Sequence, residues 1–205
     1  MELDHVFVMI SDGVRQHRAL EALGLVETYR RIHPGQGTKN ICYAFENAFL
    51  ELLWVHDEHE ARSKAIRRTL LWERSTGLAN PFGISWRGTA DVQTWDYTPP
   101  YMTKGAIPVS IDSDSPDQPL MFRTPGLASP KDWPQEKQKG LQSAAGLTQI
   151  SDVRVSARPS KTLSALENAG ILNRLPEQPA PALELICSGP AREISLTLPG
   201  DLTPP

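Results

Sequence analysis

The sequence predicts an α+β protein whose strands and helices form βαβββ modules. Three observations support this prediction. Apolar residues alternate with other residues in several short runs, which is the period of a β-strand, and a stretch with helical spacing lies between the first two runs. Segments near the C-terminus repeat the order of apolar residues found near the N-terminus. The chain has 205 residues, 40% of them hydrophobic, so it can bury a core and intrinsic disorder is excluded.

The first module is expected over residues 1–56. A strand at 3–10 is followed by a helix that ends at Gly24, because glycine readily adopts the left-handed conformation that terminates a helix. Three further strands complete the βαβββ order, at 25–32, 40–45 and 49–55.

The remaining chain divides less clearly. Helical spacing predicts a connecting helix within 57–81, and strand patterns at 82–88 and 107–112 predict a loop-rich middle module over 82–125. Eight of the 18 prolines lie between Pro99 and Pro134, which excludes long hydrogen-bonded ladders there. A polar linker is expected at 126–148, and a shortened C-terminal βα-β unit at 149–205.

Three short segments of the C-terminal unit repeat the first module in the same order. ALEALGL at 19–25 is echoed by ALENAGI at 165–171, LDHVFV at 3–8 by ISDVRV at 150–155, and LELL at 50–53 by LELI at 183–186. The repeat aligns His5 with Asp152 and Glu51 with Glu184.

Composition narrows the possible partners. The net charge is −3, and neither sign is gathered into a long block, so nucleic acid is not an expected partner. No stretch reaches the ~20 apolar residues that span a bilayer. The start of the chain does not have the pattern of a signal peptide. The expected location is the cytoplasm, with no membrane partner.

His5 and Glu51 are the candidate catalytic residues. Each lies in an otherwise apolar strand, and alternation places His5 on one face with Phe7. An ionised carboxylate on an apolar face is costly unless it is paired or liganded, so Glu51 requires a partner. His5 or a metal could serve, and this donor pair suits zinc, nickel, manganese or ferrous iron.

The segments LDHVFVMI, LEALGL, HPGQGTKN and AFENAFLELLWV together resemble the vicinal oxygen chelate superfamily, in particular its glyoxalase-like branch (glyoxalase/bleomycin resistance/dioxygenase type). The resemblance implies paired βαβββ modules whose curved mixed sheet forms an open cup. It implies a divalent metal, held by a first-strand residue and a last-strand carboxylate of each of two modules. His5 and Glu51 match these two positions in the first module.

The resemblance also implies a function. It implies a metal-assisted lyase, isomerase or related enzyme that acts on a small oxygenated substrate, and a possible homodimer. A metal-free small-molecule binding or resistance-type protein that uses the same cup is the alternative.

The sequence does not decide which region supplies the second half of the site. If the C-terminal unit is the partner module, Asp152 and Glu184 complete the ligand set. If the middle region is the partner, Asp112 takes the last-strand place and either Ser85 or Arg87 takes the first-strand place. An arginine there would repel a metal and favour an anionic ligand. Further candidates for contact with the substrate are Trp86, Tyr43, Phe7 and Asn40.

Overall fold

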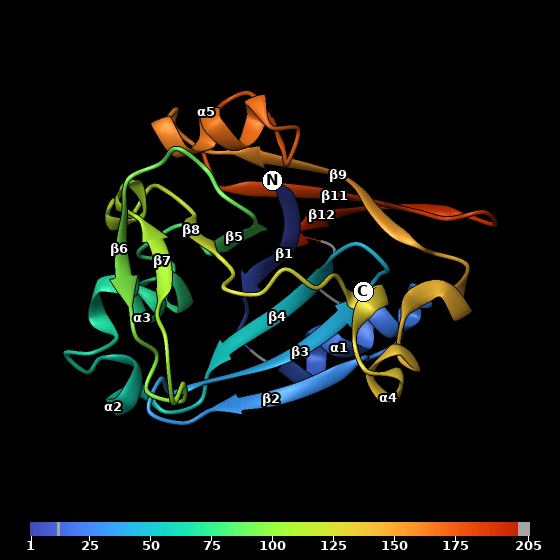
Figure 1. Ribbon diagram of the computed structural model, residues 1–205, viewed down its shortest axis with the longest axis horizontal. Helices are drawn as coiled ribbons and strands as arrows, with labels where there is room; N and C mark the ends of the chain where they lie inside the picture. Colours follow the sequence, from blue (N-terminus) through green and yellow to red (C-terminus); the bar gives the residue numbers. More distant parts are fainter. Residues whose placement is uncertain (12, 201–205) are drawn as a thin grey trace.

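The computed structural model describes residues 1–11 and 13–200. It contains an eight-stranded mixed sheet and a separate four-stranded sheet, which pack against each other (Figure 1). The α+β class predicted from the sequence is confirmed. No helix in the described ranges is long and apolar enough to cross a membrane.

The first half of the large sheet is the predicted βαβββ module. Its elements are β1 (Glu2–Met9), α1 (Gly13–Ala22), β2 (Tyr29–His33), β3 (Thr38–Ala44) and β4 (Phe49–Val55). The strands lie in the order β2-β3-β4-β1, with β1 parallel to β4. Gly24 has a φ of 81° just after α1, which is the left-handed residue expected at the end of this helix.

The second half of the large sheet comes from the middle region. Its strands are β5 (Phe82–Arg87), β6 (Thr94–Tyr97), β7 (Ile107–Ser110) and β8 (Leu120–Arg123). Their order, β5-β8-β7-β6, repeats that of the first half, and β5 pairs antiparallel with β1 so that His5 faces Ser85. The middle region, rather than the C-terminal unit, therefore completes the large sheet. No helix is found between β5 and β6, where the first half has α1.

The connecting helix expected within 57–81 is wrong as a single element. The structure has three short pieces: α2 (Glu58–Ala61), the 3-10 turn η1 (Arg67–Thr69) and α3 (Leu71–Ser75). Leu70, with a φ of 56°, breaks the continuity between η1 and α3, because a left-handed residue cannot continue a helix. Buried Arg74 then ties α3 to the chain before β5 and β8, since it donates to the carbonyls of Thr69, Asn80, Ser113 and Gln118.

Residues 126–148 are not a free linker. Their short elements are η3 (Pro130–Asp132), α4 (Gln135–Gln138) and η4 (Gln142–Ala145), while η2 (Ile111–Asp114) follows β7. Buried Gln142 exchanges two hydrogen bonds with the backbone of Val26, and the Thr28 hydroxyl donates to the Gly140 carbonyl at 2.6 Å. This segment is thus fixed against the first half of the sheet.

The C-terminal unit forms the small sheet. It consists of β9 (Gln149–Ser156), α5 (Lys161–Asn168), β10 (Asn173–Arg174), β11 (Ala182–Ser188) and β12 (Glu193–Leu198), with strand order β10-β9-β11-β12. This order differs from that of the first module, so the sequence echo preserves a strand and a helix but not the sheet. Residues 201–205 of the predicted unit lie outside the described residues.

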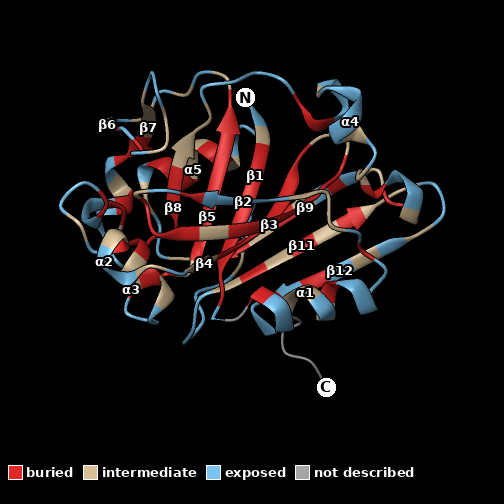
Figure 2. Ribbon diagram, turned by 90° about the horizontal axis from the view of Figure 1, so that it is seen from below, coloured by how far each residue is buried: buried red, intermediate tan, exposed pale blue. Residues whose placement is uncertain are grey.

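One hydrophobic core joins the two sheets. It includes Val8, Tyr43 and Trp86 from the back of the large sheet and Val153 and Leu185 from the small one. In Figure 2 the buried strands of the large sheet lie against those of the small sheet, and the exposed face of α1 is turned to solvent. The opposite face of the large sheet is left for a cavity.

Candidate active site in the cup

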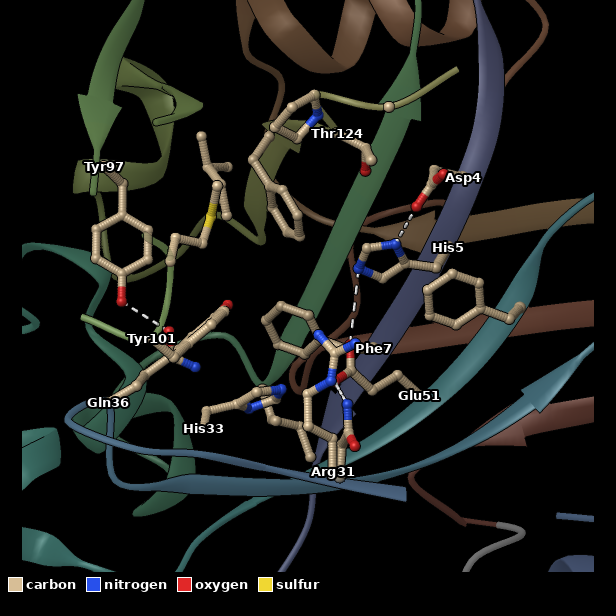
Figure 3. Close-up of a pocket in the computed structure, with 18 of the residues that line it drawn as sticks. Asp4, His5, Phe7, Arg31, His33, Gln36, Glu51, Tyr97, Tyr101 and Thr124 are labelled. Atoms are coloured by element: carbon tan, nitrogen blue, oxygen red, sulfur yellow. Dashed lines mark hydrogen bonds and ion pairs between the residues drawn. The ribbon is translucent and has the colours of Figure 1, made fainter. Parts of the chain in front are cut away.

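The face of the large sheet that points away from the small sheet lines a cavity of about 740 Å³ (Figure 3). Both halves of the sheet contribute to it, together with the loop after β6 and the segment that follows β8. This volume is typical of a small-molecule site. Polar, charged and aromatic side chains make up much of the lining: Asp4, His5, Phe7, Tyr29, Arg31, His33, Asn40, Phe49, Glu51, Tyr97, Tyr101, Phe122, Thr124, Trp133 and Lys137.

His5 is buried and held on three sides. Its Nδ1 lies 2.5 Å from Asp4 Oδ1. Its ring stacks on Phe49 with the centroids 4.4 Å apart, and the ring of Phe122 lies edge-on to it with the centroids 5.3 Å apart. The Asp4 carboxylate therefore fixes the orientation of the imidazole and leaves Nε2 directed at Glu51.

Glu51 is anchored in a similar way. Asn40, on the neighbouring strand β3, donates from Nδ2 to Glu51 Oε1 at 2.5 Å, while Oε2 lies 3.6 Å from His5 Nε2. Each of the two candidate residues thus has one polar atom bound to the protein and one atom facing the other. The gap is too long for a direct hydrogen bond, and it opens into the cavity.

Arg87 lies behind this pair. Its Nη1 is 3.1 Å from Asp4 Oδ2 and its Nη2 donates to the Asn47 carbonyl at 2.7 Å. Burial on its own would raise the pKa of Asp4. The hydrogen bond with His5, one with Thr124 and the charge of Arg87 outweigh burial, so that the pKa of Asp4 lies below its ordinary value. Asp4 is therefore a carboxylate that can accept the Nδ1 proton of His5.

The second half of the sheet places hydroxyl groups where the first half has His5 and Glu51. Ser85 is opposite His5 in the register, and Thr124 directly follows β8. Their hydroxyls are 2.6 Å apart and hydrogen-bond to each other. The two halves are therefore similar in backbone and different in side chains.

These donors fit only half of the metal site that the resemblance implies. Catalytic zinc is usually held by three protein ligands. Among the described residues, no group of three His, Cys, Asp or Glu side chains converges to hold a metal ion. His5 and Glu51 are suitable donors, but Asp4 is committed to His5 and Arg87, and hydroxyls replace the other pair.

The three predicted carboxylates beyond Glu51 are not brought to this cavity. Asp112 lies on η2, where its Oδ2 accepts the Thr162 N–H at 2.8 Å. Asp152 and Glu184 lie on the small sheet, where both pair with Arg154 at 2.7 and 3.6 Å. Their alignment with His5 and Glu51 in the sequence therefore does not correspond to a shared site.

Of the expected substrate contacts, Phe7 and Asn40 line the cavity, and the other three do not. Tyr43 and Trp86 belong to the core between the sheets, because strand alternation turns them to the opposite face from Asn40 and Ser85. Arg87 supports Asp4 instead of facing the ligand space.

Sequence reasoning missed Asp4, Arg31 and His33. The pairing of β1 with β5 shifts register between Leu3 and His5, and such an irregularity re-aims side chains, so neighbouring Asp4 and His5 can both face the cavity. The ring of His33 stacks on Tyr101 at 4.9 Å, and burial lowers the pKa of His33. Burial also raises the pKa of Tyr101 to about 12.

The paired half-sheets around one cavity form a glyoxalase-like fold. Residues 3–97 match the family described as the glyoxalase-like domain. This match confirms the glyoxalase-like resemblance seen in the sequence and is consistent with the vicinal oxygen chelate superfamily. No curated protein matches the chain.

Solved structures are similar in fold at low sequence identity. A hypothetical protein from Staphylococcus aureus is 14% identical with a TM-score of 0.51, over 96% of this chain and 84% of that one. A methylmalonyl-CoA epimerase from Streptomyces coelicolor, in complex with 2-nitronate-propionyl-CoA, is 15% identical with a TM-score of 0.41, over 63% of this chain and 99% of that one. Methylmalonyl-CoA epimerase from Mycobacterium tuberculosis is 16% identical with a TM-score of 0.37, over 60% and 85%.

Proposed function

We propose that this protein is an enzyme that moves a proton on a small oxygenated substrate, as a lyase or isomerase does, with Glu51 and His5 as its catalytic residues. The observation that supports this most directly is the opposed pair of unbound atoms, Glu51 Oε2 and His5 Nε2, 3.6 Å apart at the cavity floor. Each partner is oriented by a further side chain, as general acid–base catalysis requires.

The two residues have distinct roles in the proposal. Glu51 Oε2 takes a proton from a carbon next to a carbonyl, and the electron pair of that C–H bond moves onto the carbonyl oxygen as an enolate. His5, when protonated at both nitrogens, donates from Nε2 to this oxygen. Return of the proton to a different position completes an isomerisation. Asn40 holds Glu51, and Asp4 holds His5 and stabilises its positive charge.

The low solvent exposure of the two residues also supports proton transfer. His5 and Glu51 are only 8% and 7% exposed, so few waters compete for their free atoms. Limited solvent access strengthens the electrostatic contacts that stabilise a developing oxyanion.

Exchange of a substrate proton with solvent deuterium tests this proposal without knowledge of the final product. A panel of small 2-oxo and 2-hydroxy acids is incubated with the protein in deuterated buffer, and loss of the C–H signal is followed by NMR. Glu51→Gln should slow exchange by about 10²–10⁴-fold, the usual contribution of a general base. The matched control is Glu184→Gln, which alters the aligned glutamate outside the cavity and should leave the rate unchanged.

Two other results would redirect the proposal. Tight binding in the cavity with no exchange above the uncatalysed rate would favour a small-molecule binding or resistance-type protein. Metal content after dialysis against zinc, nickel, manganese or ferrous iron gives a separate test. One ion per chain that is lost in both His5→Ala and Glu51→Ala would show that both donors hold a metal, and would redirect the proposal to a metal-assisted reaction.

A further inference from the structure

The cavity has two chemically different sides, and together they specify a ligand. We infer that the substrate of the proposed proton transfer is an aryl-substituted 2-oxo acid. Its carboxylate binds beside Arg31 and Lys137, and its aromatic ring lies between Phe7, Phe122 and their apolar neighbours. This inference rests on the proposed function for the reaction, but its binding test does not depend on turnover.

The cationic side begins on the edge strand β2. Tyr29, Arg31 and His33 alternate along this strand and all line the cavity, whereas Arg30 points away and pairs with Glu27. Arg31 reaches from β2 toward Glu51 (Figure 3). The backbone of Arg31 pairs with Asn40 on β3, but among the described residues no hydrogen bond or ion pair is found for its side chain, which lines the cavity. An unpaired guanidinium is suited to bidentate binding of a carboxylate.

A second cation lies on the same side. Lys137 on α4 stands over the rings of Tyr29 and Trp133, with its Nζ 5.1 and 5.3 Å from their centroids. The faces of aromatic rings attract the ammonium group without neutralising it. Two positive charges therefore flank Tyr29, and an anionic group of the ligand is the complement they lack.

The other side of the cavity is apolar. It is formed by α3 and the second half of the sheet, together with Phe7 and Leu53 of the first half. Its other lining side chains include Leu71, Tyr97, Val109, Leu120 and Phe122. The rings of Phe7 and Phe122 are 6.4 Å apart and tilted by 34°. A polar group would lose its hydration here without compensation, whereas an aromatic ring would gain edge and face contacts.

His5 and Glu51 lie on β1 and β4, between β2 and the second half of the sheet. A ligand that spans both sides presents its middle atoms to them. In an aryl 2-oxo acid these middle atoms are a carbonyl and the CH₂ group next to it. Its protons are acidified by the carbonyl, so Glu51 can remove one while His5 donates to the oxygen. The proton and electron movements are those of keto–enol tautomerisation, which needs no further reactant.

Calorimetric titration with three probes tests the ligand class. Phenylpyruvate has both groups, pyruvate lacks the ring and phenylacetone lacks the carboxylate. Phenylpyruvate should bind about tenfold or more tightly than either of the others, since each missing group removes interactions worth a factor of ten or more. Equal affinity for all three probes would overturn the inference.

Two arginine variants on one strand provide the matched comparison. Arg31→Met should weaken phenylpyruvate binding by about tenfold or more and leave phenylacetone unaffected. Arg30→Met removes the same charge from the outer face and should change neither. Both side chains are exposed, so neither variant is expected to unfold. If Arg31→Met binds phenylpyruvate as the wild type does, the carboxylate site is wrong.

Failure of this inference can be separated from failure of the proposed function. Glu51-dependent deuterium exchange in another ligand, without binding of phenylpyruvate, would refute the ligand class and keep the function. Arg31-dependent binding of phenylpyruvate, with exchange unaffected by Glu51→Gln, would refute the proton transfer and keep the ligand class.

Discussion

The two halves of the large sheet have the same strand order and very different side chains on their cavity face. The first half carries Asp4, His5, Asn40 and Glu51, which form two hydrogen-bonded pairs. The second half presents mainly apolar side chains, and Ser85 and Thr124 hydrogen-bond to each other at the corresponding place. Repetition of a backbone arrangement therefore does not imply repetition of its chemistry.

The two halves also differ in what packs against the face that points away from the cavity. The first half packs against α1. The second half has no helix in the corresponding place, and the small sheet contributes to the core behind it, where Trp86 and Met121 lie with Val155 and Leu163. A hydrogen bond at 2.7 Å between the Ser110 and Thr162 hydroxyls ties β7 to α5. The C-terminal unit thus supplies the apolar packing partner that a helix provides in the first half and that the second half of the large sheet lacks.

The largest effect is expected in the anchoring of the second half. Arg74 is 1% exposed and donates to four carbonyls. Arg74→Met should lower the free energy of unfolding by about 3–5 kcal/mol, because buried acceptors lose a charged partner. Urea denaturation measures this. Arg68→Met, which removes a surface ion pair with Asp114, should cost less than about 1 kcal/mol. Equal losses of unfolding free energy in the two variants would show that the hydrogen bonds of Arg74 do not anchor the second half.

The next effect concerns the polar network of the first half. Asp4→Asn should lower the free energy of unfolding at neutral pH by about 2–3 kcal/mol, because Arg87 and His5 lose their buried anionic partner. The folded state holds the pKa of Asp4 below its unfolded value. The contribution of Asp4 is therefore present above pH about 4 and is lost as pH falls through the lower, folded pKa.

The pH dependence gives a check that a packing defect would not mimic. Urea midpoints of wild type and Asp4→Asn, measured from neutral pH down to acid, should converge as Asp4 becomes protonated. A constant difference over that range would contradict the assignment of Asp4 as a buried carboxylate.

A smaller effect is expected at the junction between the halves. A Cβ on Gly83 would lie 1.9 Å from Cε1 of Phe7, so Gly83→Ala must displace this ring toward the cavity. Overpacking of this kind typically costs about 1–3 kcal/mol. Thermal denaturation should show the loss, and phenylpyruvate binding should weaken. Gly77→Ala places its Cβ where nothing lies within 4 Å, but the φ of Gly77 is 77°. This variant should therefore lose stability through backbone strain and leave ligand binding unchanged.

The smallest effect is expected for the aligned acidic pair of the C-terminal unit. Arg154→Met removes the shared partner of Asp152 and Glu184. Arg154 is partly exposed, so its surface ion pairs should add little to stability, and deuterium exchange should not change. A large loss of exchange would mean that these carboxylates act on the cavity after all.

Sequence patterns predicted the first half well and the second half in part. Strong alternation identified β1 and β4, and it selected His5 and Glu51 as polar residues on apolar strands. The four-residue strands β6 and β8 were missed, because each is too short to show a period and prolines surround them. The left-handed residue Leu70 could not be foreseen, since leucine rarely adopts that conformation.

The sequence by itself determined the fold class, the strand–helix order of the first module and two residues of the candidate site, because these depend on local periodicity and on the cost of burying a carboxylate. Only the tertiary structure decided which region completes the cup. It also turned Asp4 toward His5, gathered the proline-rich segments into the cavity wall and placed Glu184 outside it. These outcomes depend on register and on contacts between residues far apart in the chain, which no short pattern encodes.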